Sequence, residues 1–243
     1  MKNTIIFLAL SIISFKVYSK FEHHPHIATS ATTLSPGKLA FETTPGAGVG
    51  ASLFASSLSV GITKRFQAGI VPIFFFIREH RFNINFKAKI LERSNFKSTL
   101  GYTYIRFKFE GQEYIKINGD PLIVNMHIIS PSLNYSFENT GYSLGLSYSH
   151  SFYNMNRETG DLLNHSGYEW ALDVSKVIYD NYVISFGLGE HQTNSLPSPN
   201  SEVFGIGLSF RWLRAHKFLS TPRIGAHFLK SKKVLLLATS DFY

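Results

Sequence analysis

The alternation of large apolar residues with glycine, serine and other small polar residues is the feature that most limits how this chain can fold. It is clearest in "GYSLGLSYSHSFY", from Gly141 to Tyr153. Because side chains on a strand point alternately to two faces, one face of this segment carries Tyr, Leu, His and Phe, and the other carries Ser and Gly. The solvent face of a soluble sandwich more often carries charged residues and Thr. The pattern therefore predicts strands with an apolar outward face and a crowded polar inward face.

The same alternation recurs between turn signals along most of the chain. It predicts strands over residues 37–44, 56–64, 66–78, 82–91, 96–108, 122–137, 140–153, 168–179, 181–190, 202–212, 218–229 and 232–243. Short connections alternate with longer ones, which is typical of antiparallel strands with turns at one end and loops at the other. We therefore predict an all-β fold, an antiparallel up-and-down barrel of about 12 strands, with ten or fourteen as the alternatives.

A lipid bilayer explains why the polarity is inverted. Hydrocarbon cannot hydrogen-bond the backbone, so only a closed sheet can cross it as strands without leaving an unpaired edge. The outward face of such a transmembrane barrel is apolar, with aromatic girdles at the two interfaces. The predicted interface residues are Tyr148, His150, Phe152, Tyr168, Trp170 and Trp212.

The first residues predict an exported protein. "MKNTIIFLALSIISFKVYSK" has an early Lys, an apolar run and small residues near its end, which is the pattern of a secretory signal peptide over residues 1–19. No later segment supplies the roughly 20 apolar residues of a membrane helix. We expect residues 20–36 to form a flexible His-containing segment and residues 37–243 to form the barrel. Cysteine is absent, which excludes disulfides and Cys-ligated metals.

Charged residues at inward positions of the predicted strands give the strongest indication of function. A barrel of about 12 strands lies between small filled barrels and wide open channels. If its lumen is open, an excess of positive side chains favours anions. We therefore predict a narrow pore or passive transporter for small polar or anionic solutes. The alternative is a non-conducting structural barrel whose outer loops bind a partner, a surface or lipopolysaccharide. The predicted lumen-lining residues are Glu42, Lys87, Lys89, Lys97, Glu169, Asp173, Arg211, Arg223 and His227.

Other functions are less well supported by the residues present. The pI is about 9.5, but the Lys and Arg residues are dispersed, so no nucleic-acid partner is predicted. His150 and Ser151 are adjacent and lie on opposite faces of a strand, where they cannot act as base and nucleophile. We predict no enzymatic activity, no catalytic residue and no cofactor.

Three imidazoles lie close together near the start of the predicted mature chain. His23, His24 and His26 are separated only by a proline, and imidazoles at this spacing can share a Zn, Ni or Cu ion. A flexible segment with incidental metal affinity is the alternative.

With this signal peptide and strand pattern, and with its aromatic end in "VLLLATSDFY", the chain resembles bacterial outer-membrane β-barrel proteins of Gram-negative cells. The resemblance implies an outer-membrane location, outer loops at the cell surface, contact with outer-membrane lipid and lipopolysaccharide, and recognition by the barrel-assembly machinery. The stretches "HHPHIATSATTLSPGKLAFE" and "SLSVGITKRFQAGI" are similar to small transporter-like barrels of aromatic-degradation pathways. That similarity favours transport.

Overall fold

The computed structural model describes residues 31, 33–43, 56–111, 121–137, 140–157, 162–178, 182–193, 203–212, 221–229 and 234–241. Within these ranges the chain is all-β, as the alternation predicts, and it contains no α-helix. A short 3-10 helix, η2 (Pro72–Phe76), lies between β3 and β4. The strands are β1 (Leu39–Thr43), β2 (Ser56–Thr63), β3 (Phe66–Ile70), β4 (His80–Arg93), β5 (Phe96–Phe109), β6 (Leu122–Ser136), β7 (Tyr142–Arg157), β8 (Leu162–Ile178), β9 (Tyr182–Thr193), β10 (Val203–Trp212), β11 (Thr221–Leu229) and β12 (Val234–Asp241).

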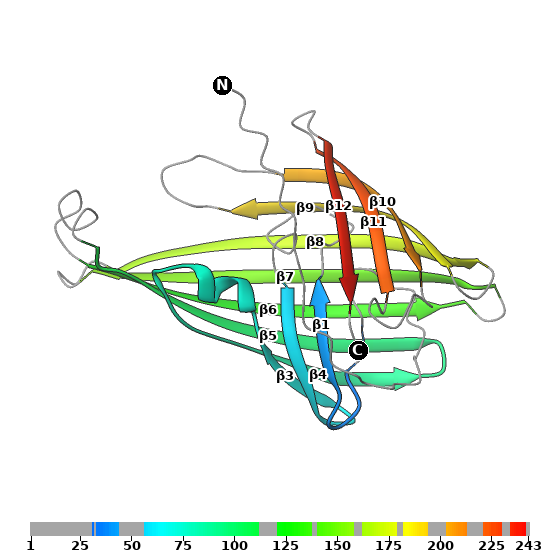
Figure 1. Ribbon diagram of the computed structural model, residues 1–243, viewed down its shortest axis with the longest axis horizontal. Helices are drawn as coiled ribbons and strands as arrows, with labels where there is room; N and C mark the ends of the chain where they lie inside the picture. Colours follow the sequence, from blue (N-terminus) through cyan, green and yellow to red (C-terminus); the bar gives the residue numbers. More distant parts are fainter. Residues whose placement is uncertain are drawn as a thin grey trace.

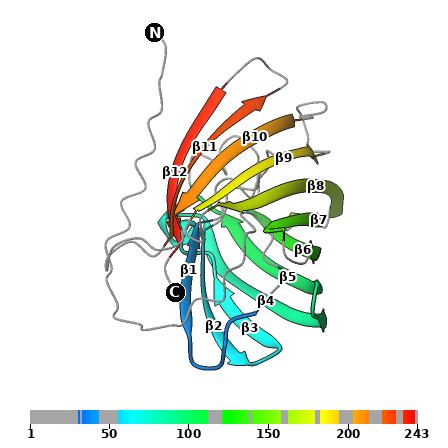
Figure 2. The same cartoon turned by 90° about the vertical axis from the view of Figure 1, so that its right-hand side faces the viewer.

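The described strands form one antiparallel up-and-down sheet in which spatial order follows chain order from β1 to β12. Each strand from β2 to β11 pairs with the strand before it and the strand after it, so each connection joins direct neighbours (Figure 1). The sheet curls strongly, and β12 approaches β1 (Figure 2). The backbone registers of the described residues run through all neighbouring pairs and do not join β12 to β1. The sheet therefore has a concave inner face and a convex outer face.

Burial on this sheet is the reverse of that in a soluble domain. On β7, Ser143 is 0% exposed, and Ser151 is also buried. Leu146 on the opposite face is 42% exposed, and Leu144 and Phe152 are similarly exposed. The same division recurs on β9, where serine and glycine are buried and isoleucine and phenylalanine are exposed. The described strands thus turn small polar side chains inward and large apolar side chains outward.

The strand predicted over residues 66–78 is wrong beyond its first five residues. β3 ends at Ile70, and the chain then turns through η2. Pro72 has no N–H to donate to a strand ladder, and its fixed φ suits the first turn of a helix. Its neighbour Val71 is buried and bonds a side chain instead of a strand: its N–H donates to Asn83 Oδ1 at 2.6 Å, and its carbonyl accepts from Asn83 Nδ2 at 3.2 Å.

The segment that precedes β1 folds back across the inner face of the β2–β3 hairpin. The Leu34 N–H donates to the buried Gln67 Oε1 at 3.0 Å, and the Thr33 hydroxyl donates to the Lys64 carbonyl at 3.0 Å. A Cβ added at Gly61 would lie 2.1 Å from the Ser35 carbonyl oxygen. Only glycine therefore leaves room for the backbone to cross at this point.

Candidate functional site

The concave face of the sheet is lined with hydroxyl and amide groups that bond one another across neighbouring strands. Thr99 Oγ1 lies 2.6 Å from Ser132 Oγ between β5 and β6, and Ser175 Oγ lies 2.8 Å from Ser185 Oγ between β8 and β9. All four side chains are buried. Buried hydroxyls need partners, and the opposing strand supplies them for these four, whereas the buried Ser59 and Ser143 hydroxyls have no hydrogen-bond partner among the described residues. The wall of the candidate lumen is polar but largely satisfied within itself.

The predicted lysines lie on the β4–β5 part of this concave face. Lys87 faces Gln67 on one side and Gly101 on the other, and it is half-buried. Lys89 Nζ donates to Glu92 Oε2 at 2.8 Å, and Lys97 Nζ lies 3.6 Å from Glu92 Oε1. Glu92, which the sequence analysis did not single out, therefore joins two of the three lysines near the turn end of the hairpin.

The predicted acidic residues lie on a different part of the wall. Asp173 on β8 is 0% exposed, and its Cα partners on the two neighbouring strands are Gly145 and Gly187. Glu169, four residues earlier on the same strand, is half-buried. The lysines of β4 and β5 and the carboxylates of β8 are separated by β6 and β7, so the inner wall carries positive and negative charge in separate regions.

Four other predicted lumen residues are placed by their backbone alone. Glu42 pairs with Ser57, Arg211 pairs with Arg223, and His227 pairs with Gly207. Their side chains lie outside the described part of the structure, as does that of Trp212. The three N-terminal histidines, His23, His24 and His26, and the predicted signal peptide lie in residues 1–30, also outside it.

The predicted interface aromatics divide between the two ends of the sheet. The rings of His150 and Phe152 lie 4.4 Å apart, and the Tyr148 hydroxyl lies 3.0 Å from His150 Nδ1. On β8, Tyr168 and Trp170 stand directly opposite His150 and Tyr148. These five residues form one outward cluster toward the loop end. Trp212 pairs with Tyr182 in the backbone register at the turn end.

Trp170 makes a further polar contact in this cluster. Its indole Nε1 donates to Glu190 Oε2 at 3.0 Å. An indole that buries an apolar ring and keeps one hydrogen bond is the usual arrangement at a membrane interface. Ser151, by contrast, turns inward and donates to the Gly167 carbonyl at 3.2 Å, so His150 and Ser151 do lie on opposite faces.

Sequence reasoning missed a cluster of aromatic rings around a histidine at the loop end. The His80 ring stacks 6.1 Å from Phe74 and meets Phe75 and Phe107 edge to face. His80 Nε2 lies 2.9 Å from Asn83 Nδ2, which fixes the ring against the amide that also holds Val71. The three-residue spacing of His80 and Asn83 in one strand gives no sign of this contact in the sequence.

A charged group at the loop end of β4 and β5 was also missed. Arg81 Nη2 lies 2.8 Å from Glu110 Oε1, and Lys108 Nζ pairs with the other oxygen of the same carboxylate. Hydrogen bonds from Lys108, and then from Arg81, hold the pKa of Glu110 below its ordinary value. Glu110 is therefore a charged carboxylate between two cations at neutral pH.

No protein-family model, curated protein or solved structure matches this chain. In the part of the chain that the structure describes, no helix is long and apolar enough to cross a membrane. In the same residues, His, Asp and Glu do not gather in threes at a spacing that would hold a metal ion.

Proposed function

We propose that this chain forms a transmembrane antiparallel barrel of about 12 strands that acts as a narrow pore or passive transporter for small polar or anionic solutes. The observation that carries the proposal is the inverted burial: Ser143, Ser175 and Ser185 are buried, while Leu144, Leu146 and Phe186 are exposed. In water, a continuous outward apolar face would cost free energy and favour aggregation. In a bilayer the same face is solvated by lipid.

The outward residues of β5 support a membrane crossing. From the turn end to the loop end they read Leu100, Tyr102, Tyr104, Arg106 and Lys108. This order matches a hydrocarbon layer, an aromatic interface and a charged head-group region. Closure between β12 and β1 would remove the two remaining sheet edges from lipid, and the curl that brings these strands together is consistent with it.

The lysines on the concave face support preference for anions. Lys87, Lys89 and Lys97 face inward from β4 and β5 and are neither fully buried nor fully exposed. Glu92 neutralises part of this charge near the turn. A partly hydrated positive wall attracts small anions and repels cations.

Single-channel recording in planar bilayers tests the pore. We expect small, anion-selective openings from the wild-type protein. The double variant Lys87→Glu/Lys89→Glu should shift the reversal potential toward cations. The matched variant Lys64→Glu/Arg65→Glu changes the same charge on the exposed β2–β3 turn and should leave the sign of selectivity unchanged. Absence of openings at every voltage would remove the pore hypothesis, and equal shifts in both variants would remove the assignment of the lysines to the lumen.

A second candidate function is favoured by the dense packing of the inner wall. Asp173, Ser175 and Ser185 on β8 and β9 have almost no exposed surface even though they face the concave side. A filled interior would make the protein a non-conducting barrel whose outer loops bind a partner, a surface or lipopolysaccharide. The same recording decides between the two candidates, because a filled barrel inserts into bilayers without producing openings.

A further inference from the structure

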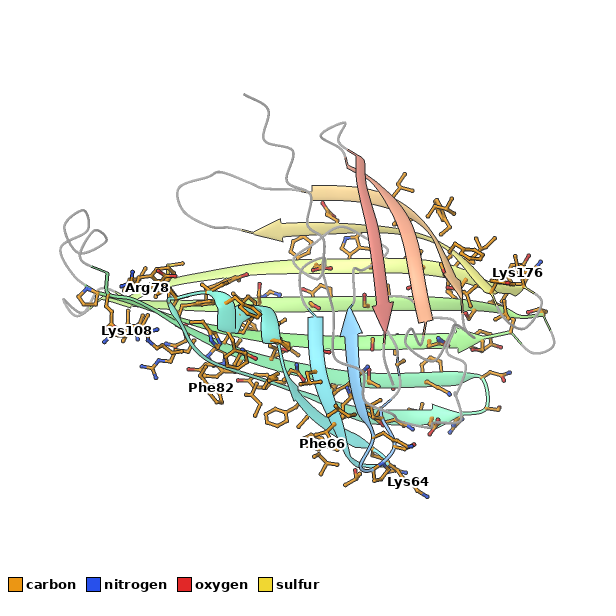
Figure 3. The ribbon with its side chains drawn as sticks, viewed as in Figure 1. Lys64, Phe66, Arg78, Phe82, Lys108 and Lys176 are labelled. Atoms are coloured by element: carbon orange, nitrogen blue, oxygen red, sulfur yellow. The ribbon has the colours of Figure 1, made fainter. Side chains whose placement is uncertain are left out.

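Four cationic side chains gather at the loop end of β4 and β5. They are Arg78, Arg81, Arg106 and Lys108, and with Glu110 we call them the outer rim. Arg78 and Arg106 are exposed, and no carboxylate of the described residues forms an ion pair with either of them. The Lys108 N–H donates to the Glu79 carbonyl at 2.7 Å, which brings the end of β5 next to the residues that precede β4. Figure 3 shows Arg78 and Lys108 together at this end of the sheet.

The outer rim is held in place by its own hydrogen bonds. Arg81 Nη1 donates to the Arg78 carbonyl at 2.8 Å and to the His80 carbonyl at 3.1 Å, while Nη2 reaches Glu110. Glu110 also pairs with Lys108. One carboxylate therefore fixes two cations, while Arg78 and Arg106 are exposed and form no ion pair with another described residue. Guanidinium groups are suited to bidentate binding of phosphate.

Apolar surface adjoins the outer rim on the side of the predicted membrane. Its rings are those of Phe82 on β4 and Tyr104 on β5, whose centroids lie 6.1 Å apart. Phe82 is exposed on the outer face, directly opposite Arg106 in the register of β4 and β5. A ligand that satisfies this surface needs an anionic group at the level of the arginines and hydrocarbon next to Phe82 and Tyr104. A free anion would meet only the first requirement.

We propose that the outer rim binds the phosphorylated head group of a membrane glycolipid, with Arg78 and Arg106 as the phosphate ligands. The proposal rests on the proposed function, because it places the rim at the head-group level of a bilayer. Phosphate oxygens would accept hydrogen bonds from the guanidinium groups of Arg78 and Arg106, and the acyl chains would lie along Phe82 and Tyr104. Arg81 would hold the backbone of the rim in position through its bonds to the Arg78 and His80 carbonyls.

The test compares two lipids on the full-length protein in neutral detergent micelles. Diphosphoryl lipid A, and the same lipid A with both phosphates removed, are titrated and bound lipid is counted by native mass spectrometry. We expect the diphosphoryl form to bind at least about tenfold more tightly, as charge-assisted hydrogen bonds imply. The variant Arg78→Gln/Arg106→Gln should lose about tenfold for that lipid only. Equal affinity for the two lipids in the wild-type protein would overturn the proposal.

Two further variants separate a specific site from general attraction. The control Lys64→Gln/Arg65→Gln removes the same charge from the β2–β3 turn, where Figure 3 labels Lys64, and should bind diphosphoryl lipid A as the wild type does. An equal loss in this control would show that net charge alone accounts for binding and would refute the site. Glu110→Gln frees Arg81 and Lys108 and should raise affinity about threefold. No increase would contradict the competition between Glu110 and phosphate for these cations.

Inorganic phosphate and neutral vesicles complete the test. Displacement of lipid A by millimolar inorganic phosphate would assign the rim to a free anion and overturn the lipid proposal. Insertion into phosphatidylcholine vesicles, measured as protection of the strands from protease, tests membrane crossing without any phosphorylated glycolipid. A protein that inserts but does not distinguish the two lipids refutes only the outer-rim site. A protein that does not insert refutes the proposed function.

Discussion

Replacing Asn83 with alanine should destabilise the protein more than any other single polar change on β4. Asn83 is buried, and its amide group takes the place of a strand partner for Val71, which is itself only 4% exposed. The same amide contacts His80 Nε2. In the alanine variant the Val71 N–H loses its bond to the side chain at a site with little access to water, while the Val71 carbonyl keeps the bond that it accepts from the Phe74 N–H at 3.2 Å.

The magnitude follows from one orphaned backbone donor, the Val71 N–H. A buried donor or acceptor that loses its partner costs about 1–3 kcal/mol. One such donor, partly rehydrated by the space that the side chain leaves, gives an expected loss of about 1–3 kcal/mol. The loss should concentrate at η2, because Val71 is the residue through which η2 joins β3. Asn83→Asp keeps the acceptor for the Val71 N–H and removes the donor to the Val71 carbonyl. Any loss of stability in this variant should therefore not come from an orphaned Val71 N–H.

Equilibrium unfolding in guanidinium chloride, with the protein in vesicles and tryptophan fluorescence as the signal, measures the change. Asn85→Ala is the matched control: Asn85 lies two residues along β4 on the same face, is half-buried, and makes no side-chain hydrogen bond with the rest of the described chain. We expect Asn85→Ala to cost less than about 1 kcal/mol. If both variants lose the same stability, the hydrogen bonds of the Asn83 amide to the Val71 backbone do not stabilise the protein.

Two other predictions concern stability. Gly61→Val places a Cβ 2.1 Å from the Ser35 carbonyl oxygen, so we expect a loss of about 1–3 kcal/mol in the same unfolding assay, and an unchanged midpoint would mean that the segment before β1 does not cross the inner face. Glu110 has a lowered pKa because of Lys108 and Arg81, so its contribution is present above its unfolded pKa and is lost as pH falls through its lower folded pKa. The melting temperature of wild type should therefore exceed that of Glu110→Gln at pH 7 and converge with it near pH 3, and a constant difference would contradict the pairing.

The strands could be predicted from the sequence because a period of two directly reflects the pleat of the backbone. In β7, buried serine and exposed leucine alternate as the letters do. The end of β3 could not be predicted in this way. The run "AGIVPIFFFI" is apolar at both parities, and the choice between strand and η2 depends on an amide twelve residues later in the chain.

The charged sites were harder to predict for a similar reason. The inward position of Lys87 and Lys89 follows from local alternation, but the pairing of Lys89 and Lys97 with Glu92 depends on a turn and on a β-bulge near Lys89. Arg81 and Glu110 are separated by 29 residues in the chain and meet only because β4 and β5 pair over their full length. Local patterns identify which face a residue occupies, and pairing of strands decides which residues meet.

The crossing of the β2–β3 hairpin by residues 33–35 has a consequence for the order of assembly. Each strand of the sheet bonds its neighbour in the chain, so pairing can proceed as a series of local steps. The bond between Leu34 and Gln67, however, lies on the concave side, which becomes less accessible once β12 approaches β1. We therefore expect the chain to lay this segment across Gly61 while the hairpin is still open. The β2–β3 hairpin would then enter the curling sheet with its inner surface already covered.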